Sequence, residues 1–506
     1  MQCKHRVGNK IMAFFLLCIS SLLIFVTTYI FQPLIDAHRR LPPGPRRLPV
    51  IGNLHNIGRD PPHRAFAGLA NRYGPLVSVR LGGVRAVVAS SRDAAREILH
   101  RHNGDLAGRG GMDAWHACGH HGHSIIALPP RRRWRALRKL CAEEVFAPRR
   151  LAELRAVRED EARKLARAVS PVEVAVARVV FPRVASVLWR SMFSEELDPA
   201  TARELWDVVR EAVVIAGAPN ISDYFPALAA ADLLGVRHRM EKLVGWTYGV
   251  IDRQVEVRRR RRAAGEPRKN DLLDAALDME MEGEVDGEGL VMNQDATRGM
   301  FMDLLVAGSG STTSTIEWAM AELLQNPRLM EKVQEELKRV LGARTHVVES
   351  DIAKLSYLQA VVKETLRLHP TVPIGLNKAE ATVEIQGYKI PKGTTVYVNL
   401  WDICRRAKVW DDPEKFMPER FADRDVSFVG TNFELIPFGA GRRICLGMPL
   451  ADRMLHLMLA SLLHRFEWTL PDGQVGGVDM AEQFGLVLSM AIPLRAVAKQ
   501  IRSVRL

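Results

Sequence analysis

The sequence of 506 residues predicts a mainly α-helical protein with a smaller β part, preceded by a single transmembrane helix. Helical periodicity of the apolar residues dominates residues 93–339. Shorter apolar stretches with many β-branched residues, bounded by turn residues, predict strands at 76–81, at 86–89 and within 379–400. An uncharged run at residues 11–31 predicts the transmembrane helix. These observations define the fold class before any motif is considered.

The uncharged run contains 21 residues, which as a helix would span about 31 Å, the thickness of a bilayer core. It exceeds the apolar part of a signal peptide, and no cleavage pattern follows, so we expect residues 1–31 to remain as an anchor. The prolines of Leu41-Pro42-Pro43-Gly44-Pro45 stiffen the following segment, which predicts a basic, proline-rich hinge at 32–53. Residues 54–506 show no break in composition and are expected to form one domain.

The formal net charge is +13, yet no nucleic-acid motif and no basic stripe with interleaved aromatic residues is present. We therefore expect no nucleic-acid partner, and an anionic membrane surface or an acidic redox partner explains the basic clusters better. For the arginines at 258–262 a solvated loop is the expectation. The six cysteines have no paired spacing and form no C-x-x-C, so neither a disulfide framework nor a zinc site is indicated, and a reducing, cytosol-facing compartment is expected.

One cysteine, Cys445, lies in the glycine- and arginine-rich segment 438–447, directly before a long apolar helical pattern. Unpaired N–H groups and the positive end of a helix dipole favour its thiolate form. Phe438 would cover the sulfur, and Arg443 offers a cation for a carboxylate. A lone cysteine is most often a small buried hydrophobe. A thiolate beside a carboxylate-binding arginine instead suits a haem, whose iron takes the sulfur and whose propionates take the arginine.

This segment matches F-x-x-G-x-R-x-C-x-G at every fixed position, so the chain resembles the cytochrome P450 family of haem-thiolate enzymes. The resemblance implies that residues 54–506 form a haem-thiolate catalytic domain with haem b (iron protoporphyrin IX), and that Cys445 is the ligand of the metal. It also implies NADPH-cytochrome P450 reductase as partner. The expected location is the endoplasmic reticulum membrane, with a single pass and the catalytic domain facing the cytosol.

Two further motifs support the same resemblance. Glu364 and Arg367 match E-x-x-R on a predicted helix, and Arg420 lies in a segment similar to P-E-R-F. The resemblance implies that these three side chains meet and fix the loop that carries the cysteine. Trp134 and Arg138 match W-x-x-x-R, which implies contacts with a haem propionate alongside Arg443; in isolation they would be a core tryptophan and a surface arginine. Lys378 is a candidate for one further propionate contact.

Two glycines interrupt the strongly apolar helical stretch 301–324, at Gly308 and Gly310. Small side chains make room there, and neighbouring hydroxyls can bond to earlier carbonyls. The stretch resembles the family's oxygen-binding groove, A-G-x-(D/E)-T, but Gly310 stands at the acid position and Ser311 at the alcohol position. Ser311 and Thr312 are therefore the candidate catalytic residues. The alternative is a helix packed closely against a neighbour through its small residues.

Four histidines between positions 116 and 123 lack companion carboxylates or thiolates at metal spacing, so no metal site is assigned to them. The resemblance places their loop at the substrate pocket. Segments 371–376 and 484–488 are further candidate pocket walls, and their apolar composition predicts an apolar substrate.

Within the family the chain looks most similar to plant microsomal enzymes, particularly geraniol hydroxylases and cereal diterpene hydroxylases, in segments 128–131 and 218–226. The expected function is hydroxylation of an apolar small molecule, a mono- or diterpenoid, with O2 and electrons from the reductase. Two alternatives stay open: an oxygen-independent isomerase or dehydratase, and a haem-binding member with weak or lost activity. Gly310 favours the first alternative, whereas the anchor and the retained hydroxyl of Ser311 favour the monooxygenase.

Overall fold

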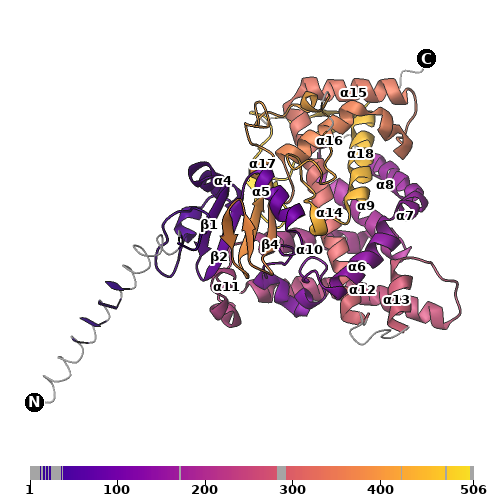
Figure 1. Ribbon diagram of the computed structural model, residues 1–506. Helices are drawn as coiled ribbons and strands as arrows, with labels where there is room; N and C mark the ends of the chain where they lie inside the picture. Colours follow the sequence, from indigo (N-terminus) through magenta and orange to yellow (C-terminus); the bar gives the residue numbers. More distant parts are fainter. Residues whose placement is uncertain are drawn as a thin grey trace, which may run out of the picture.

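The computed structural model describes residues 38–501 except 170–172, 282–291, 423, 425 and 473–475, together with Asp36 and a few positions between 12 and 23. A small β part lies beside a larger helical part (Figure 1). The anchor expected at residues 1–31 falls largely outside the described residues. Among those that are described, no helix has both the length and the apolar character needed to cross a membrane.

The main sheet has four strands in the order β1, β2, β7, β4. β1 (Leu76–Leu81) and β2 (Val84–Ala89) form an antiparallel hairpin, β7 (Thr395–Asn399) joins β2 in parallel, and β4 (Ile374–Lys378) closes the sheet antiparallel to β7. The strands predicted at 76–81 and 86–89 are therefore confirmed, as are strands within 379–400. The remaining strands form small sheets: β3 (Glu173–Ala175), β5 (Val383–Ile385), β6 (Tyr388–Ile390), β8 (Phe466–Thr469), β9 (Glu482–Gln483), β10 (Ser489–Met490) and β11 (Arg495–Gln500).

Helices make up most of the described chain, as the periodicity predicted. The α-helices are α3 (Leu54–Ile57), α4 (Pro62–Tyr73), α5 (Arg92–Arg96), α6 (Arg132–Cys141), α7 (Pro148–Glu153), α8 (Arg155–Ala168), α9 (Val176–Phe193), α10 (Pro199–Gly217), α11 (Ile221–Tyr224), α12 (Val236–Ala263), α13 (Leu272–Met281), α14 (Gln294–Gln325), α15 (Pro327–Leu341), α16 (Ser356–Leu368), α17 (Leu400–Ile403) and α18 (Met448–Arg465). Short 3-10 turns include η3 (Asp113–Gly122), η7 (Pro418–Phe421) and η8 (Gly441–Arg443).

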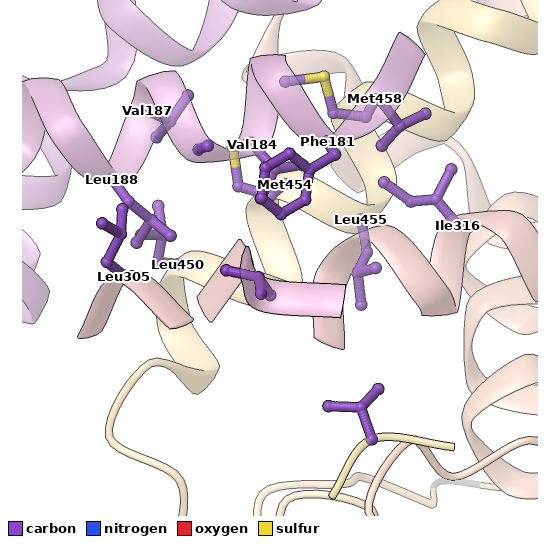
Figure 2. Close-up of a cluster of buried hydrophobic side chains, with 14 of the residues drawn as sticks. Phe181, Val184, Val187, Leu188, Leu305, Ile316, Leu450, Met454, Leu455 and Met458 are labelled. Atoms are coloured by element: carbon purple, nitrogen blue, oxygen red, sulfur yellow. The ribbon is translucent and has the colours of Figure 1, made fainter. Parts of the chain in front are cut away.

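The core of the helical part forms where α9, α14 and α18 meet. Phe181 and Leu188 of α9, Leu305 of α14, and Leu450 and Met454 of α18 point toward one another in Figure 2 and are buried. α14 contains 32 residues and is apolar on most of its faces, which is typical of a helix surrounded by others. Its N-cap is Asn293, whose side chain accepts a hydrogen bond from the N–H of Ala296. This packing fixes the helix that carries Ser311 against the helix that follows Cys445.

The expectation of a solvated loop at arginines 258–262 is wrong, because these residues are helical. α12 continues to Ala263, and every arginine of the cluster has a carboxylate partner. Arg258 is buried and binds Asp271 through two nitrogens, at 2.7 and 2.8 Å. Four of the five arginines find their partners outside α12, so the neutralisation of these charges depends on tertiary contacts that the sequence pattern does not reveal. Arg260 pairs with Glu256 one turn earlier on the same helix.

Candidate active site

A cavity of about 830 Å³ lies between the helical part and the main sheet, and apolar side chains form most of its wall. The predicted wall segments 371–376 and 484–487 line it, as do Ser311, Thr312 and Cys445. Leu488, at the end of the second predicted segment, is fully buried away from the cavity. A concave, mostly apolar site with a few polar groups is typical of small-molecule binding.

The loop that carries Cys445 has a tightly determined backbone. The N–H of Cys445 donates to the carbonyl of Phe438 at 2.9 Å, and Gly441 has a φ of +67°. A Cβ atom on Gly441 would lie 1.8 Å from the carbonyl oxygen of Leu99, so only glycine fits this position. Phe438 lines the cavity, and its ring lies 5.4 Å from that of Phe428. The loop therefore presents the sulfur to the cavity from a fixed position.

Burial raises the pKa of the Cys445 thiol, whereas the N–H groups of Gly447 and Met448 and the charge of Arg138 lower it. The side chain is enclosed by protein, but its surface is accessible from the cavity that it lines. The sequence-based expectation that the helix N-terminus alone favours the thiolate is therefore incomplete, since burial outweighs these groups. A metal cation that binds sulfur removes the proton outright, so this position suits a thiolate ligand of a metal.

Three arginines converge beside this loop: the expected Arg138 and Arg443, and Arg109, which the sequence did not single out. Arg138 donates to the carbonyl of Ile444, and Arg109 donates to the carbonyls of Leu376 and Ile126. Within the described chain, none of the three forms an ion pair with a carboxylate. Arg109 follows a glycine and precedes two more, and that signal pointed only to a loop.

Arg443 lies over Trp134, with Cζ 4.6 Å from the ring centroid, and Arg138 lies on the same ring at 5.4 Å. The indole N–H of Trp134 donates to the carbonyl of Ile125 at 2.9 Å. That N–H is therefore already satisfied, and the ring acts as a platform for the two guanidinium groups. Lys378 also lines the cavity, on β4.

Burial lowers the pKa of Arg109 to about 10 and that of Arg443 to about 9, with the nearby arginines adding to both shifts. Such buried cations need anions, because desolvated charge without a partner is costly. The two propionate groups of a haem would supply this negative charge, and Cys445 would supply the ligand of its iron. The donor set therefore fits a haem, which when bound supplies the iron that activates oxygen.

The predicted Glu364–Arg367–Arg420 cluster is confirmed as a structural unit. Arg367 binds Glu364 through two nitrogens at 2.7 and 3.0 Å, and Arg420 Nε donates to Glu364 Oε1 at 2.9 Å. The side chains of Glu364 and Arg367 are 0% exposed. Arg367 also donates to the carbonyls of Cys404 and Pro413, so the cluster fixes the irregular chain that leads from β7 toward the cysteine loop.

The small residues of α14 show two features considered from the sequence, close packing against a neighbouring helix and a hydroxyl that bonds to an earlier carbonyl. A Cβ on Gly308 would lie 2.9 Å from Leu188 Cδ1, so this glycine permits close packing on α9. Ser311 Oγ donates to the carbonyl of Ala307 at 2.7 Å, as expected for a hydroxyl that bonds to an earlier turn. Gly310 does not line the cavity; a Cβ there would meet Val209 of α10 at 3.4 Å. The acid position therefore faces α10, behind the cavity wall.

Sequence comparison places these features in a known class of haem proteins. The family model described as Cytochrome P450 matches residues 42–491. Geraniol 8-hydroxylase of Catharanthus roseus is 41% identical over 501 residues, which cover 96% of this chain and 99% of that protein. Ferruginol synthase of Isodon rubescens is 39% identical over 474 residues (91% and 94%), and carnosic acid synthase of Salvia fruticosa is 40% identical over 471 residues (90% and 93%).

A cysteine loop facing a mostly apolar cavity, beside arginines that form no ion pair with the described carboxylates, is the arrangement expected of a haem-thiolate protein. With the match over nearly its whole length, the chain belongs to the cytochrome P450 family. It is a monooxygenase with a haem iron cofactor that acts on small molecules and takes electrons from a redox partner.

Proposed function

We propose that the protein hydroxylates a mono- or diterpenoid. The observation that carries this proposal is the mostly apolar wall of the cavity onto which Cys445 opens, a space of about 830 Å³ that has to hold haem and substrate together. Its wall offers few charged side chains, so it suits a substrate that is largely hydrocarbon. Relatives at 39–41% identity are named for oxidation of geraniol and for synthesis of ferruginol and carnosic acid, which supports a terpenoid over other apolar molecules.

The cofactor in this proposal is haem b. Cys445 holds its iron, Phe438 covers the sulfur, and Arg109, Arg138 and Arg443 take the propionates, with Trp134 as their platform. The sequence has no C-x-x-C-H for covalent attachment, which supports a non-covalently bound haem. NADPH-cytochrome P450 reductase supplies electrons. Residues 1–31 anchor the protein in the endoplasmic reticulum membrane and residues 32–53 form the hinge, so residues 54–506 face the cytosol.

In this proposal the hydroxyl groups of Ser311 and Thr312 on α14 supply protons to the site. Ser311 Oγ is held by the carbonyl of Ala307 at 2.7 Å, and both Ser311 and Thr312 line the cavity. Because Gly310 carries no carboxyl group, these hydroxyls and the water that they order hold the protons that oxygen activation consumes. The relatives named as hydroxylases and synthases favour this monooxygenase over the oxygen-independent isomerase or dehydratase that Gly310 left open in the sequence.

Product analysis tests the proposal. Microsomes that contain the protein and a plant reductase are supplied with geraniol and with an abietane hydrocarbon, with and without NADPH and O2. We expect hydroxylated products that require both, and none with Cys445→Ser, whose reduced carbon monoxide complex should also lose the long-wavelength thiolate band. Cys118→Ser, which changes a cysteine outside the cavity, is the matched control. A defined product at full rate without oxygen would contradict the proposal.

A further inference from the structure

A polar cluster centred on Asp303 of α14 lies in the wall of the cavity, apart from the arginines beside the cysteine loop. His120 Nε2 lies 3.1 Å from Asp303 Oδ1, and Ser124 Oγ lies 2.8 Å from Asp303 Oδ2. The N–H of Ile126 donates to Oδ2 at 3.2 Å. His120, Ser124 and Asp303 are all buried. None of them belongs to the cysteine loop or to the group of Arg109, Arg138 and Arg443 beside it.

Three hydrogen bonds of the cluster end at Asp303. An ionised carboxylate only accepts, so His120 must carry its proton on Nε2. His120 Nδ1 lies 2.9 Å from the hydroxyl of Tyr248, which donates to it when the imidazole is neutral. Burial and the charge of Asp303 raise the pKa of Tyr248, so the phenol stays protonated. The chain Tyr248–His120–Asp303 thus stabilises a carboxylate inside an apolar wall.

This carboxylate retains acceptor capacity. Its two oxygens offer about four acceptor positions, of which His120, Ser124 and Ile126 use three. Asp303 and His120 line the cavity, whereas Ser124 and Tyr248 do not. The α14 residues on either side of Asp303, Met302 and Leu304, are apolar. A substrate that donates a hydrogen bond here is favoured over one that leaves the carboxylate desolvated and unsatisfied.

The position of Asp303 along α14 relates it to the candidate catalytic hydroxyl. Asp303, Ala307 and Ser311 follow one another at intervals of four residues and all line the cavity, so they share one face of the helix. Eight residues of α-helix rise about 12 Å. A substrate held at Asp303 therefore reaches Ser311 with a part of the molecule distant from the hydrogen-bonded group.

We propose that Asp303 binds a hydroxyl group of the substrate, so that the enzyme selects terpenoid alcohols over terpene hydrocarbons and oxidises them at a carbon remote from that hydroxyl. This inference rests on the proposed terpenoid function. Asp303 is the specificity-determining residue, and His120 and Ser124 are positioning residues that act through it. The cluster also joins the 120–126 segment to α14, so the proposed alcohol site lies where these two walls of the cavity meet.

Equilibrium binding to the haem-loaded enzyme tests this without oxygen or reductase. The probes are geraniol and the hydrocarbon in which its hydroxyl is replaced by hydrogen, each titrated by the spectral shift that accompanies binding. We expect the wild type to bind the alcohol roughly tenfold or more tightly than the hydrocarbon, as for a hydrogen bond to a charged group. Asp303→Asn should reduce this ratio to near one, because the amide oxygen is taken by the donors already present.

Tyr248→Phe is the matched control, since it shortens the network outside the cavity and keeps the carboxylate. Its alcohol-to-hydrocarbon ratio should stay within about twofold of the wild type. Ser124→Ala frees an acceptor position on Asp303 and should raise the ratio; if Asp303→Asn fails to load haem, an unchanged or lowered ratio in Ser124→Ala would overturn the proposal. An unchanged ratio in Asp303→Asn, or an equal fall in Tyr248→Phe, would overturn the proposal.

The outcomes separate this inference from the function on which it rests. If terpenes of both kinds are oxidised but bind equally, terpenoid oxidation stands and the role of Asp303 is overturned. If the alcohol is preferred in an Asp303-dependent way but no terpenoid is oxidised, the binding role stands and the terpenoid assignment falls.

Discussion

The guanidinium group of Arg443 lies over the indole ring of Trp134, with Cζ 4.6 Å from the ring centroid, and its Nε donates to the carbonyl of Ala107 at 2.8 Å. The pair thus joins the cysteine loop to the segment before η3 and to α6. Stacking and a planar fork of donors are properties of arginine that lysine does not share. This relationship leads to the first prediction.

Arg443→Lys should keep the positive charge but loosen the haem. We expect haem transfer to an excess of an apo-globin acceptor to be roughly tenfold faster than for the wild type, because stacking and carboxylate-pairing geometry are both lost. Arg442→Lys, at the exposed neighbouring position, is the control and should transfer haem at the wild-type rate. Equal rates for both variants would mean that Arg443 makes no contact with the cofactor.

Glu364→Gln should destabilise the protein by about 3–5 kcal/mol, because it leaves Arg367 buried without its counter-charge. The expected result is a low yield of haem-loaded protein and a lower midpoint in urea. Lys332→Ala removes an exposed ion pair of 2.5 Å with Glu419, and it should cost less than about 1 kcal/mol. A urea midpoint of Glu364→Gln equal to that of Lys332→Ala would show that the cluster does not support the cysteine loop.

Gly310→Asp should increase the fraction of electrons that end in product rather than in peroxide. The new side chain would point toward Val209 of α10, where a Cβ meets Cγ1 at 3.4 Å, and its carboxyl group could hold a proton behind the Ser311 turn. Gly310→Asn has nearly the same shape without a titratable group, so it should leave coupling unchanged. Coupling is measured as product and peroxide formed per NADPH consumed; Ser311→Ala should lower it. Full coupling in the unmodified enzyme would show that no acid is needed at this position.

Glu317 should make stability fall as pH rises. Burial raises the pKa of this carboxyl group to about 7, although the N–H of Leu494 donates to it at 2.9 Å. Between its ordinary value of 4.5 and about 7 the unfolded chain loses the proton while the folded protein keeps it. The folded state then loses up to about 3 kcal/mol over this range, since one pKa unit corresponds to about 1.4 kcal/mol.

Glu317→Gln removes this titration. Urea midpoints measured between pH 4.5 and pH 7.5 should therefore decline less steeply in the variant than in the wild type. Glu335→Gln, at an exposed position on α15, serves as the control. Parallel curves for Glu317→Gln and the wild type would contradict the prediction.

Deletion of residues 1–31 should release the protein at least partly from microsomes, because these residues contain the 21-residue uncharged run. The measurement is the fraction of protein in the supernatant after an alkaline carbonate wash. Replacing the run with an unrelated transmembrane sequence should restore retention. Complete retention of the deletion variant would mean that another part of the chain inserts into the bilayer.

The sequence alone determined the mainly helical class, the strands of the β1–β2 hairpin and the cysteine loop, because each depends on local periodicity or on a compact motif. It also predicted the meeting of Glu364, Arg367 and Arg420 through the family resemblance. The order of these motifs was sufficient to identify the haem-thiolate class, since each motif consists of residues only a few positions apart.

Only the tertiary structure decided which charges are neutralised and which remain available for a ligand. The arginines at 258–262 appeared to be a solvated loop until α13 and its neighbours supplied their carboxylate partners. Arg109 and Asp303 carried no sequence signal, because their surroundings come from segments far apart in the chain. Whether a polar side chain is satisfied, paired or open to a cavity depends on packing between distant elements, and no local pattern encodes it.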